Sequence, residues 1–175
     1  ILSAARERGA QTNKIFLIDR HIEFCTNCRS CTQEKDAVRG ECVIQDEMPS
    51  ILDELEQSDA LIIASPMNFG SITAVMKKFQ ERLACYAWWP WGAYYPKRRN
   101  IPKNKRVILV VSSAAPAVFA RFFTGMVRQL KEIVQCLGAK DINLLFVGLS
   151  AMKPQQELDN RTRDKARRLG EKLVS

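Results

Sequence analysis

Short apolar runs alternate with longer amphipathic stretches along most of this chain. The apolar runs predict four buried strands, at residues 14–19, 59–65, 105–112 and 141–148. Apolar positions at helical spacing predict helices around them, at residues 1–9, 49–57, 71–85, 117–137 and 155–174. Strands that are apolar throughout and are separated by helices indicate a parallel sheet covered on both faces. We therefore expect an α/β protein with a three-layer α/β/α sandwich.

The length and composition are those of a single globular domain over residues 1–175. Hydrophobic residues make up 46% of the chain and charged residues 26%, and no apolar run is long enough for a membrane span. Residues 1–9 resemble the end of a helix closed by Gly9, and no initiator Met is present. We therefore expect that a first strand is missing from this chain, so that the complete domain has five strands and five helices. Charged residues near the start argue against a secretory signal peptide.

A long cysteine loop, residues 20–47, follows the first predicted strand. Its thiols have the spacing Cys-x2-Cys-x2-Cys-x10-Cys and belong to Cys25, Cys28, Cys31 and Cys42. Four thiolates suit either a [4Fe–4S] cluster or a structural zinc, and their number does not choose between the metals. Cysteines without a metal are the third possibility.

The other two cysteines, Cys85 and Cys136, fall on apolar positions of predicted helices, so we expect them in the core. A chain of this size and apolar content does not need a disulfide framework. We expect reduced thiols and a cytoplasmic location.

An aromatic loop, residues 86–104, holds all three tryptophans and all three tyrosines of the chain, next to several basic residues. Such a loop is expected to cover a ligand or to pack in a subunit interface, and we predict the interface. Residues 96–175 carry 17 basic and 6 acidic groups, whereas residues 1–95 carry 10 and 13. The basic half indicates an anionic partner such as a nucleotide, with a surface that includes Lys97, Arg98 and Arg99, or else a solvated face. We expect no nucleic acid, because exposed aromatics are not interleaved at an RNA-binding spacing.

Two strand ends carry small residues that suit a ligand. Two segments, Ser65-Pro-Met-Asn-Phe-Gly-Ser71 and Ser112-Ser-Ala-Ala-Pro116, each lead from a predicted strand to a predicted helix. Ligands of parallel sheets bind at the carboxyl ends of the strands. Gly70 lets the backbone approach a ligand, and the Asn68 amide can both donate to and accept from a heterocycle. Small residues leave room for a flat ring, although ordinary strand–helix connections are the other interpretation.

The run from Asp59 to Leu83 is similar to the central signature of the NAD(P)H-dependent FMN reductase group of flavodoxin-like proteins. In that group an aspartate-led strand ends in Ser-Pro-x-Tyr/Asn, followed by Gly and a helix with a Lys-x-Phe core. The run Cys42-Val-Ile-Gln-Asp-Glu-Met48 resembles the iron–sulfur flavoprotein branch. The resemblance covers nearly the whole chain and implies the strand order 2-1-3-4-5. It also implies flavin contacts from Ser65, Pro66, Met67, Asn68, Phe69, Gly70, Ser112, Ser113, Ala114 and Ala115.

The resemblance further implies an FMN-dependent oxidoreductase that passes electrons from NAD(P)H through the flavin to a quinone, a flavin or an iron–sulfur acceptor. It implies a [4Fe–4S] cluster on the four loop cysteines and a homodimer or homotetramer. No catalytic acid or base is required, because the flavin carries the chemistry. The alternative is a zinc-stapled binding module without catalysis that holds a nucleic acid or protein on its basic half.

Three departures from the family pattern stand out. The phosphate-binding loop of the family follows the first strand, which precedes this chain. The last cysteine interval, ten residues between Cys31 and Cys42, is longer than in the compact motif. Asn68 occupies the position where the family usually has Tyr, so that Phe69 or a Trp at 88–91 would supply ring stacking.

Overall fold

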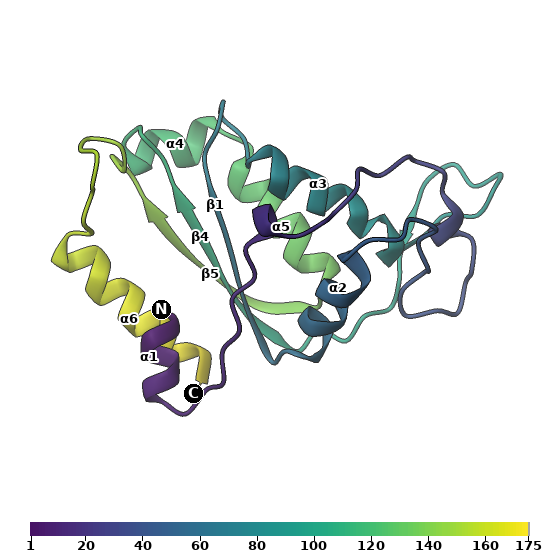
Figure 1. The fold of residues 1–175 in the computed structure, drawn as a ribbon, viewed down its shortest axis with the longest axis horizontal. Coiled ribbons are helices and arrows are strands. Elements are labelled where there is room, and N and C mark those ends of the chain that lie inside the picture. The colour runs from purple at the N-terminus through teal and green to yellow at the C-terminus, as the bar shows by residue number, and fades with distance from the viewer. Residues whose placement is uncertain (175) are drawn as a thin grey trace.

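The computed structural model describes residues 1–174, apart from the side chain of Arg121. Its centre is a parallel sheet in the order β1-β4-β5 (Figure 1), with the strands β1 (Ala60–Pro66), β4 (Lys105–Ser112) and β5 (Ala139–Val147). These strands confirm three of the four predicted strands and the parallel pairing. Their order is that of strands three, four and five in the expected order 2-1-3-4-5.

Six helices flank the described sheet. In chain order they are α1 (Leu2–Glu7), α2 (Met48–Gln57), α3 (Ala74–Arg82), α4 (Ala117–Phe123), α5 (Met126–Cys136) and α6 (Asn160–Val174). Short 3-10 turns and a small antiparallel pair complete the fold: η1 (Leu17–Asp19), η2 (Ser30–Thr32), η3 (Leu83–Tyr86), β2 (Ala87–Trp88) and β3 (Lys97–Arg98). None of the described helices has the length and apolar character needed to cross a membrane.

The single helix predicted at residues 117–137 is wrong, because the chain forms two helices there. Thr124 takes extended backbone angles, φ −126° and ψ 150°, and so ends α4. Gly125 follows, and α5 begins one residue later. Threonine and glycine are both poor helix formers, and here they stand side by side at the break.

Alternate residues of the sheet face two different helical layers, as the period of a strand requires. Leu109 of β4 is fully buried in a core shared with α3 and α5. Arg106 of the same strand donates a hydrogen bond to the Leu173 carbonyl of α6 at 3.1 Å. Helices α1 and α6 pack together in that layer (Figure 1), where a Cβ on Gly170 would lie 2.4 Å from the Ile1 carbonyl oxygen. The three-layer prediction is confirmed.

The strand predicted at residues 14–19 is wrong. Ile15 and Leu17 are half-buried against the core, whereas Phe16 and Ile18 are 53% and 73% exposed, and the segment ends in the turn η1. In the expected order this strand pairs with the first strand and not with β1. No described strand pairs with β1 on that side, so the apolar alternation remains but the hydrogen-bonded partner that makes a strand is lacking.

Candidate functional site

The loop after β1, residues 65–71 (the β1 loop), and the loop after β4, residues 112–116 (the β4 loop), leave neighbouring strands at the same level. Pro66 and Ser112 are register partners at the ends of β1 and β4. The Met67 N–H then donates to the Ser112 carbonyl at 2.8 Å, which joins the two loops beyond the sheet. The sequence placed these loops at one edge of the sheet, and the structure confirms this.

The β1 loop makes a tight turn at its tip. The backbones of Asn68 and Ser71 exchange two hydrogen bonds, at 3.0 and 2.9 Å. The residues between them, Phe69 and Gly70, have φ values of +47° and +73°. Glycine adopts this region freely, whereas Phe69 pays a conformational penalty there and holds its ring wholly in solvent. A strained, uncovered aromatic residue is typical of a ligand-binding turn.

Two of the predicted flavin residues use their hydroxyls within the loops. Ser65 is buried, and its Oγ donates to the Pro66 carbonyl at 2.9 Å and accepts from the Thr73 N–H at 3.2 Å. Ser113 is also buried, and its Oγ donates to the Ala115 carbonyl at 2.7 Å. These two serines brace the loop backbones and do not face solvent.

The remaining predicted residues form the outer surface of the two loops. Met67, Ser112 and Ala115 are half-buried, and the exposed members of the set are Pro66, Asn68, Phe69, Gly70 and Ala114. A Cβ on Gly70 would meet nothing closer than Thr124 Cγ2 at 3.9 Å, so the space beside the loop is open. This surface is small, mostly apolar and without a charged side chain. It fits the flat ring of FMN but provides no cation for its phosphate.

Sequence reasoning missed two supports of these loops. Gln129 of α5 accepts from the Ser71 Oγ at 2.9 Å and thereby ties the β1 loop to the core helix. The segment after β5 is the second support: the Ser150 N–H donates to the Ser113 carbonyl at 2.9 Å, and a Cβ on Gly148 would lie 2.3 Å from the Ala117 nitrogen. A glycine directly after an apolar strand was the available signal for that close approach.

Apolar side chains on α4 are exposed beside the candidate flavin surface. Phe119 and Phe123 stack with ring centroids 6.3 Å apart, yet each is more than 60% exposed. Val118 and Phe122 of the same helix are also more than 60% exposed, and these four side chains are here called the exposed apolar patch. Monomers rarely leave so many large apolar side chains in water.

Cys31 interacts electrostatically with the other three cysteines of the cysteine loop. Burial raises the pKa of Cys31, and negative charge on Cys42, Cys25 and Cys28 raises it further. The donor set therefore has the chemistry of a soft-metal site. Within the described residues, however, no three or more His, Cys, Asp or Glu side chains are arranged to hold a metal ion.

A buried ion pair fixes the cysteine loop to α3. Arg82, at the last position of α3, pairs with Asp46, and their side chains are 2% and 0% exposed. The Arg82 guanidinium also donates to the Glu23 carbonyl at 3.0 Å and to Cys42 Sγ at 3.5 Å. Helix α3 has nine residues, which span roughly 13 Å, so the candidate flavin loop and the cysteine loop lie at its opposite ends.

The aromatic loop packs on the cysteine loop of the same chain, at one end of the molecule (Figure 1). The Arg29 guanidinium lies over the rings of Trp89 and Trp91, 3.7 and 4.5 Å from their centroids. The Trp89 backbone N–H donates to the Thr32 carbonyl at 2.8 Å. These contacts are with the cysteine loop and not with the β1 or β4 loop. The expectation of a subunit interface remains a prediction for this loop.

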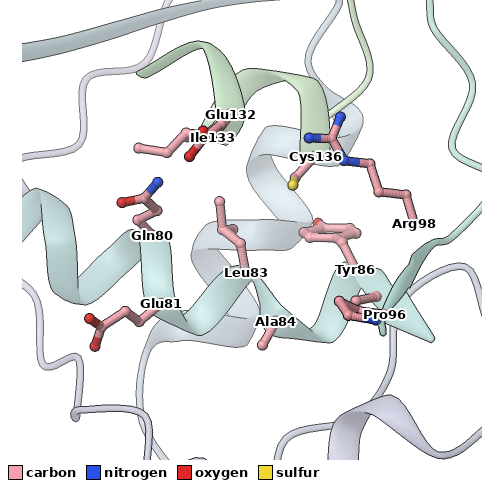
Figure 2. Close-up of a pocket in the computed structure, with 11 residues that line it drawn as sticks. Gln80, Glu81, Leu83, Ala84, Tyr86, Pro96, Arg98, Glu132, Ile133 and Cys136 are labelled. Carbon is pink, nitrogen blue, oxygen red and sulfur yellow. The ribbon is translucent and has the colours of Figure 1, made fainter. Parts of the chain in front are cut away.

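The two cysteines outside the cysteine loop differ in burial. Cys85 is 3% exposed, as predicted, and burial raises its pKa to about 12. Cys136 is only half-buried and lines a cavity of about 410 Å³ between α5 and the segment from α3 to β3. Figure 2 shows its thiol directed into this cavity, beside Leu83 and Tyr86. Neither the β1 loop nor the β4 loop contributes to the lining.

The prediction that Lys97, Arg98 and Arg99 form a basic surface is wrong for one of the three residues. Lys97 and Arg98 are exposed, but Arg99 is only 7% exposed and directs its guanidinium into the cysteine loop. Arg99 is therefore not available to a nucleotide phosphate.

Curated relatives with sequence similarity are iron–sulfur flavoproteins. One from Archaeoglobus fulgidus is 34% identical over 85 residues, 49% of this chain and 36% of its own length. One from Methanocaldococcus jannaschii is 33% identical over 81 residues, 46% and 39% of the two lengths. The chain thus spans less than two fifths of each of these relatives.

Solved structures with the same fold share little sequence with this chain. An FMN-dependent NADH-azoreductase from Bacillus anthracis, in complex with FMN, has a TM-score of 0.64 at 14% identity, covering 99% of this chain and 85% of the other. An NAD(P)H:quinone oxidoreductase from Methanothermobacter marburgensis has a TM-score of 0.64 at 16% identity, covering 98% and 87%. The family model described as "Flavodoxin-like fold" matches residues 3–172. The chain therefore belongs to the flavodoxin-like fold family.

Proposed function

We propose that this chain is the flavin-binding domain of an FMN-dependent oxidoreductase that takes electrons from NAD(P)H. The observation that carries the proposal is the pair of loops joined by the Met67–Ser112 hydrogen bond at the carboxyl edge of the sheet. Their exposed surface is small, uncharged and open, which suits a flat ring. The relatives named iron–sulfur flavoproteins, and the reductases of the same fold, support the same chemistry.

The ten predicted residues divide into two roles in this proposal. The exposed ones would contact the ring: the Asn68 amide could bond to its polar atoms, and Phe69 could stack on it. Ser65 and Ser113 hold the loop backbones in place through their internal hydrogen bonds. FMN held at this surface would supply hydride and electron-transfer chemistry. No side chain of the chain is needed as a catalytic acid or base.

The loop cysteines Cys25, Cys28, Cys31 and Cys42 are the proposed ligands of a [4Fe–4S] cluster. Four soft thiolates suit such a cluster, and the curated relatives are named for one. The comparisons give no support to a zinc-stapled binding module. A quinone, a free flavin or an iron–sulfur centre is the proposed electron acceptor.

We also propose that the protein is a homodimer or homotetramer in the cytoplasm. The exposed apolar patch beside the candidate flavin surface supports self-association, because such a patch is usually covered. All six cysteines are free thiols, which favours a reducing compartment.

A bulky side chain at Ala114 tests the flavin site. Ala114→Trp in the full-length protein is expected to raise the Kd for FMN at least about tenfold, because the indole fills the space beside the β4 loop. Ala114 is exposed, so the thermal unfolding midpoint should not fall. The measurement is an FMN titration followed by flavin fluorescence.

Asn104→Trp is the matched control, since Asn104 is exposed just before the opposite end of β4. It should leave FMN affinity unchanged. Equal FMN affinity in wild type and Ala114→Trp would place the flavin elsewhere, and absence of FMN binding by wild type would refute the proposed function.

A further inference from the structure

The turn at the tip of the β1 loop has a conformation that its own sequence does not favour. Asn68 and Ser71 exchange two backbone hydrogen bonds across Phe69 and Gly70, and both central residues have left-handed φ values. Two left-handed residues between such a pair are what a type I′ turn requires, and Asn-Gly is the preferred central pair. Phe69 is a bulky residue and is strained at the first central position. Contacts from outside the turn therefore have to offset that strain.

Two neighbouring segments supply such contacts. On the entry side, the Met67 N–H donates to the Ser112 carbonyl of β4. On the exit side, the side-chain oxygen of Gln129 in α5 accepts from Ser71 Oγ at 2.9 Å and, at a longer 3.5 Å, from the Ile72 N–H. An amide oxygen has two lone pairs, so this one side chain serves both donors at the end of the turn.

Helix α5 gives the Gln129 side chain a rigid base. Met126 and Leu130, on either side of Gln129 in the helix, are fully buried in the core, where side chains are closely packed. Thr124 lies just before the helix, and a Cβ on Gly70 would lie 3.9 Å from its Cγ2. The turn is therefore built against the beginning of α5.

We propose that Gln129 is a positioning residue for the candidate flavin surface: its side-chain oxygen holds the strained turn closed and so fixes where Asn68 and Phe69 are presented. These are the two residues whose side chains could bond to the ring or stack on it. The inference rests on the proposed function for its purpose, whereas the contacts themselves do not depend on a ligand. Hydrophobic periodicity gives no sign of this role, because Gln129 lies 58 residues from Ser71.

The acceptor oxygen, and not the length of the side chain, is the feature that the proposal requires. Gln129→Met keeps an unbranched side chain of similar length, but Ser71 Oγ and the Ile72 N–H lose their shared partner. Gln129→Glu keeps an acceptor oxygen. Gln135→Met is the matched control, because Gln135 lies near the other end of α5, is exposed and accepts from Arg98 Nη1 at 2.9 Å.

FMN affinity of the full-length protein gives the first test. Gln129→Met is expected to raise the Kd for FMN at least about fivefold, because the residues that would contact the ring are no longer held in one position. Gln135→Met should leave the Kd unchanged. Ser71→Ala removes the donor instead of the acceptor, and it should reproduce the effect of Gln129→Met. The two changes together should weaken binding no more than about twofold beyond either alone, and Ser71→Ala provides the test if Gln129→Met fails to fold.

Amide exchange in the flavin-free full-length protein tests the turn itself. The Ser71 N–H donates to the Asn68 carbonyl and not to Gln129, so its exchange rate, measured by NMR, reports closure of the turn. Gln129→Met is expected to speed this exchange at least about fivefold. Gln129→Glu should keep the wild-type rate to within about twofold, and Gln135→Met should not change it.

A substitution at Phe69 separates positioning of the turn from general support of the fold. Phe69→Asn gives the turn the central pair that suits left-handed angles, so the turn should close without help from α5. In that background, Gln129→Met should change the exchange of the Ser71 N–H less than about twofold. An equal increase in both backgrounds would overturn the proposal, because Gln129 would then act on the fold as a whole.

The two measurements distinguish failure of this inference from failure of the proposed function. A wild-type exchange rate at Ser71 in Gln129→Met would overturn the inference whatever the chain binds. Faster exchange with an unchanged Kd for FMN would also overturn it and would leave the proposed function standing, because the turn would not then position the flavin. If wild type binds no FMN while the exchange changes as expected, the proposed function fails and the hold of Gln129 on the turn stands.

Discussion

Asp46→Ala is expected to lower the free energy of unfolding by roughly 3–5 kcal/mol, the range for breaking a buried ion pair from one side. The substitution leaves the Arg82 guanidinium buried without its carboxylate. It also removes the acceptor of the Glu23 and Met48 N–H groups, which donate to Asp46 at 2.8 and 3.0 Å. Urea unfolding followed by circular dichroism measures the change. The loss is a large part of the stability of a typical domain.

An exposed ion pair is the control for this prediction. Arg128 and Glu132 on α5 are 3.7 Å apart and 82% and 48% exposed, so Arg128→Ala should cost less than about 1 kcal/mol. Replacing both buried partners, Asp46→Leu with Arg82→Met, should recover much of the loss, because no charge then remains buried. Equal destabilisation by Asp46→Ala and Arg128→Ala would show that the buried ion pair contributes no more to the free energy of unfolding than the exposed one.

The same pair predicts an acid-sensitive fold. Burial alone would raise the pKa of Asp46, but hydrogen bonds from Arg82, Glu23 and Met48 outweigh it and lower the pKa. A carboxyl with a depressed folded pKa stabilises the protein fully above its unfolded pKa, about 3.9, and loses that contribution as pH falls through the folded pKa. Wild type should therefore lose stability more steeply than Asp46→Asn below about pH 4. Parallel stability curves for the two proteins would contradict this.

Gly148→Ala is expected to cost roughly 1–3 kcal/mol and to weaken FMN binding. The new Cβ would lie 2.3 Å from the Ala117 nitrogen and 3.0 Å from the Pro116 carbonyl carbon. Both are backbone atoms, so no side-chain rotation relieves the contact. The segment after β5 or the start of α4 must move, and the β4 loop moves with them through the Ser150–Ser113 hydrogen bond.

Gly125→Ala is the matched control for this second prediction. Nothing lies within 4 Å of a Cβ at Gly125, and its φ of −78° suits any residue. It should change the unfolding midpoint and the Kd for FMN little, whereas Gly148→Ala should lower the midpoint and raise the Kd. If Gly148→Ala lowers the unfolding midpoint but leaves the Kd for FMN unchanged, the segment after β5 does not support the flavin site.

The features that follow from local pattern could be predicted from the sequence. The apolar runs of β1, β4 and β5 and the small residues after β1 and β4 fix where the candidate flavin loops meet. The segment 14–19 has the same apolar alternation but no partner strand among the described residues, and pairing cannot be read from one segment alone. The break at Thr124 was missed because apolar spacing continues across it.

The buried arginines could not be predicted, because their partners are distant in the sequence. By its spacing Arg82 belongs to the solvated face of its helix, yet it lies in the interior, paired with a carboxylate 36 residues away. Arg99 follows two exposed basic residues and resembles the rest of a surface cluster. Burial of a charge depends on acceptors that other segments supply, so hydrophobic periodicity cannot predict which charged side chain is buried.

The outermost strand of the described sheet has a consequence for handling the protein. β1 is hydrogen-bonded on one side only, to β4, and the amide and carbonyl groups along its other rim have no strand to bind among residues 1–174. Its sequence from Leu61 to Ile63 is wholly apolar. An unpaired edge of this kind recruits strands from other chains, so residues 1–174 expressed by themselves should aggregate by edge-to-edge strand pairing unless another segment covers the edge.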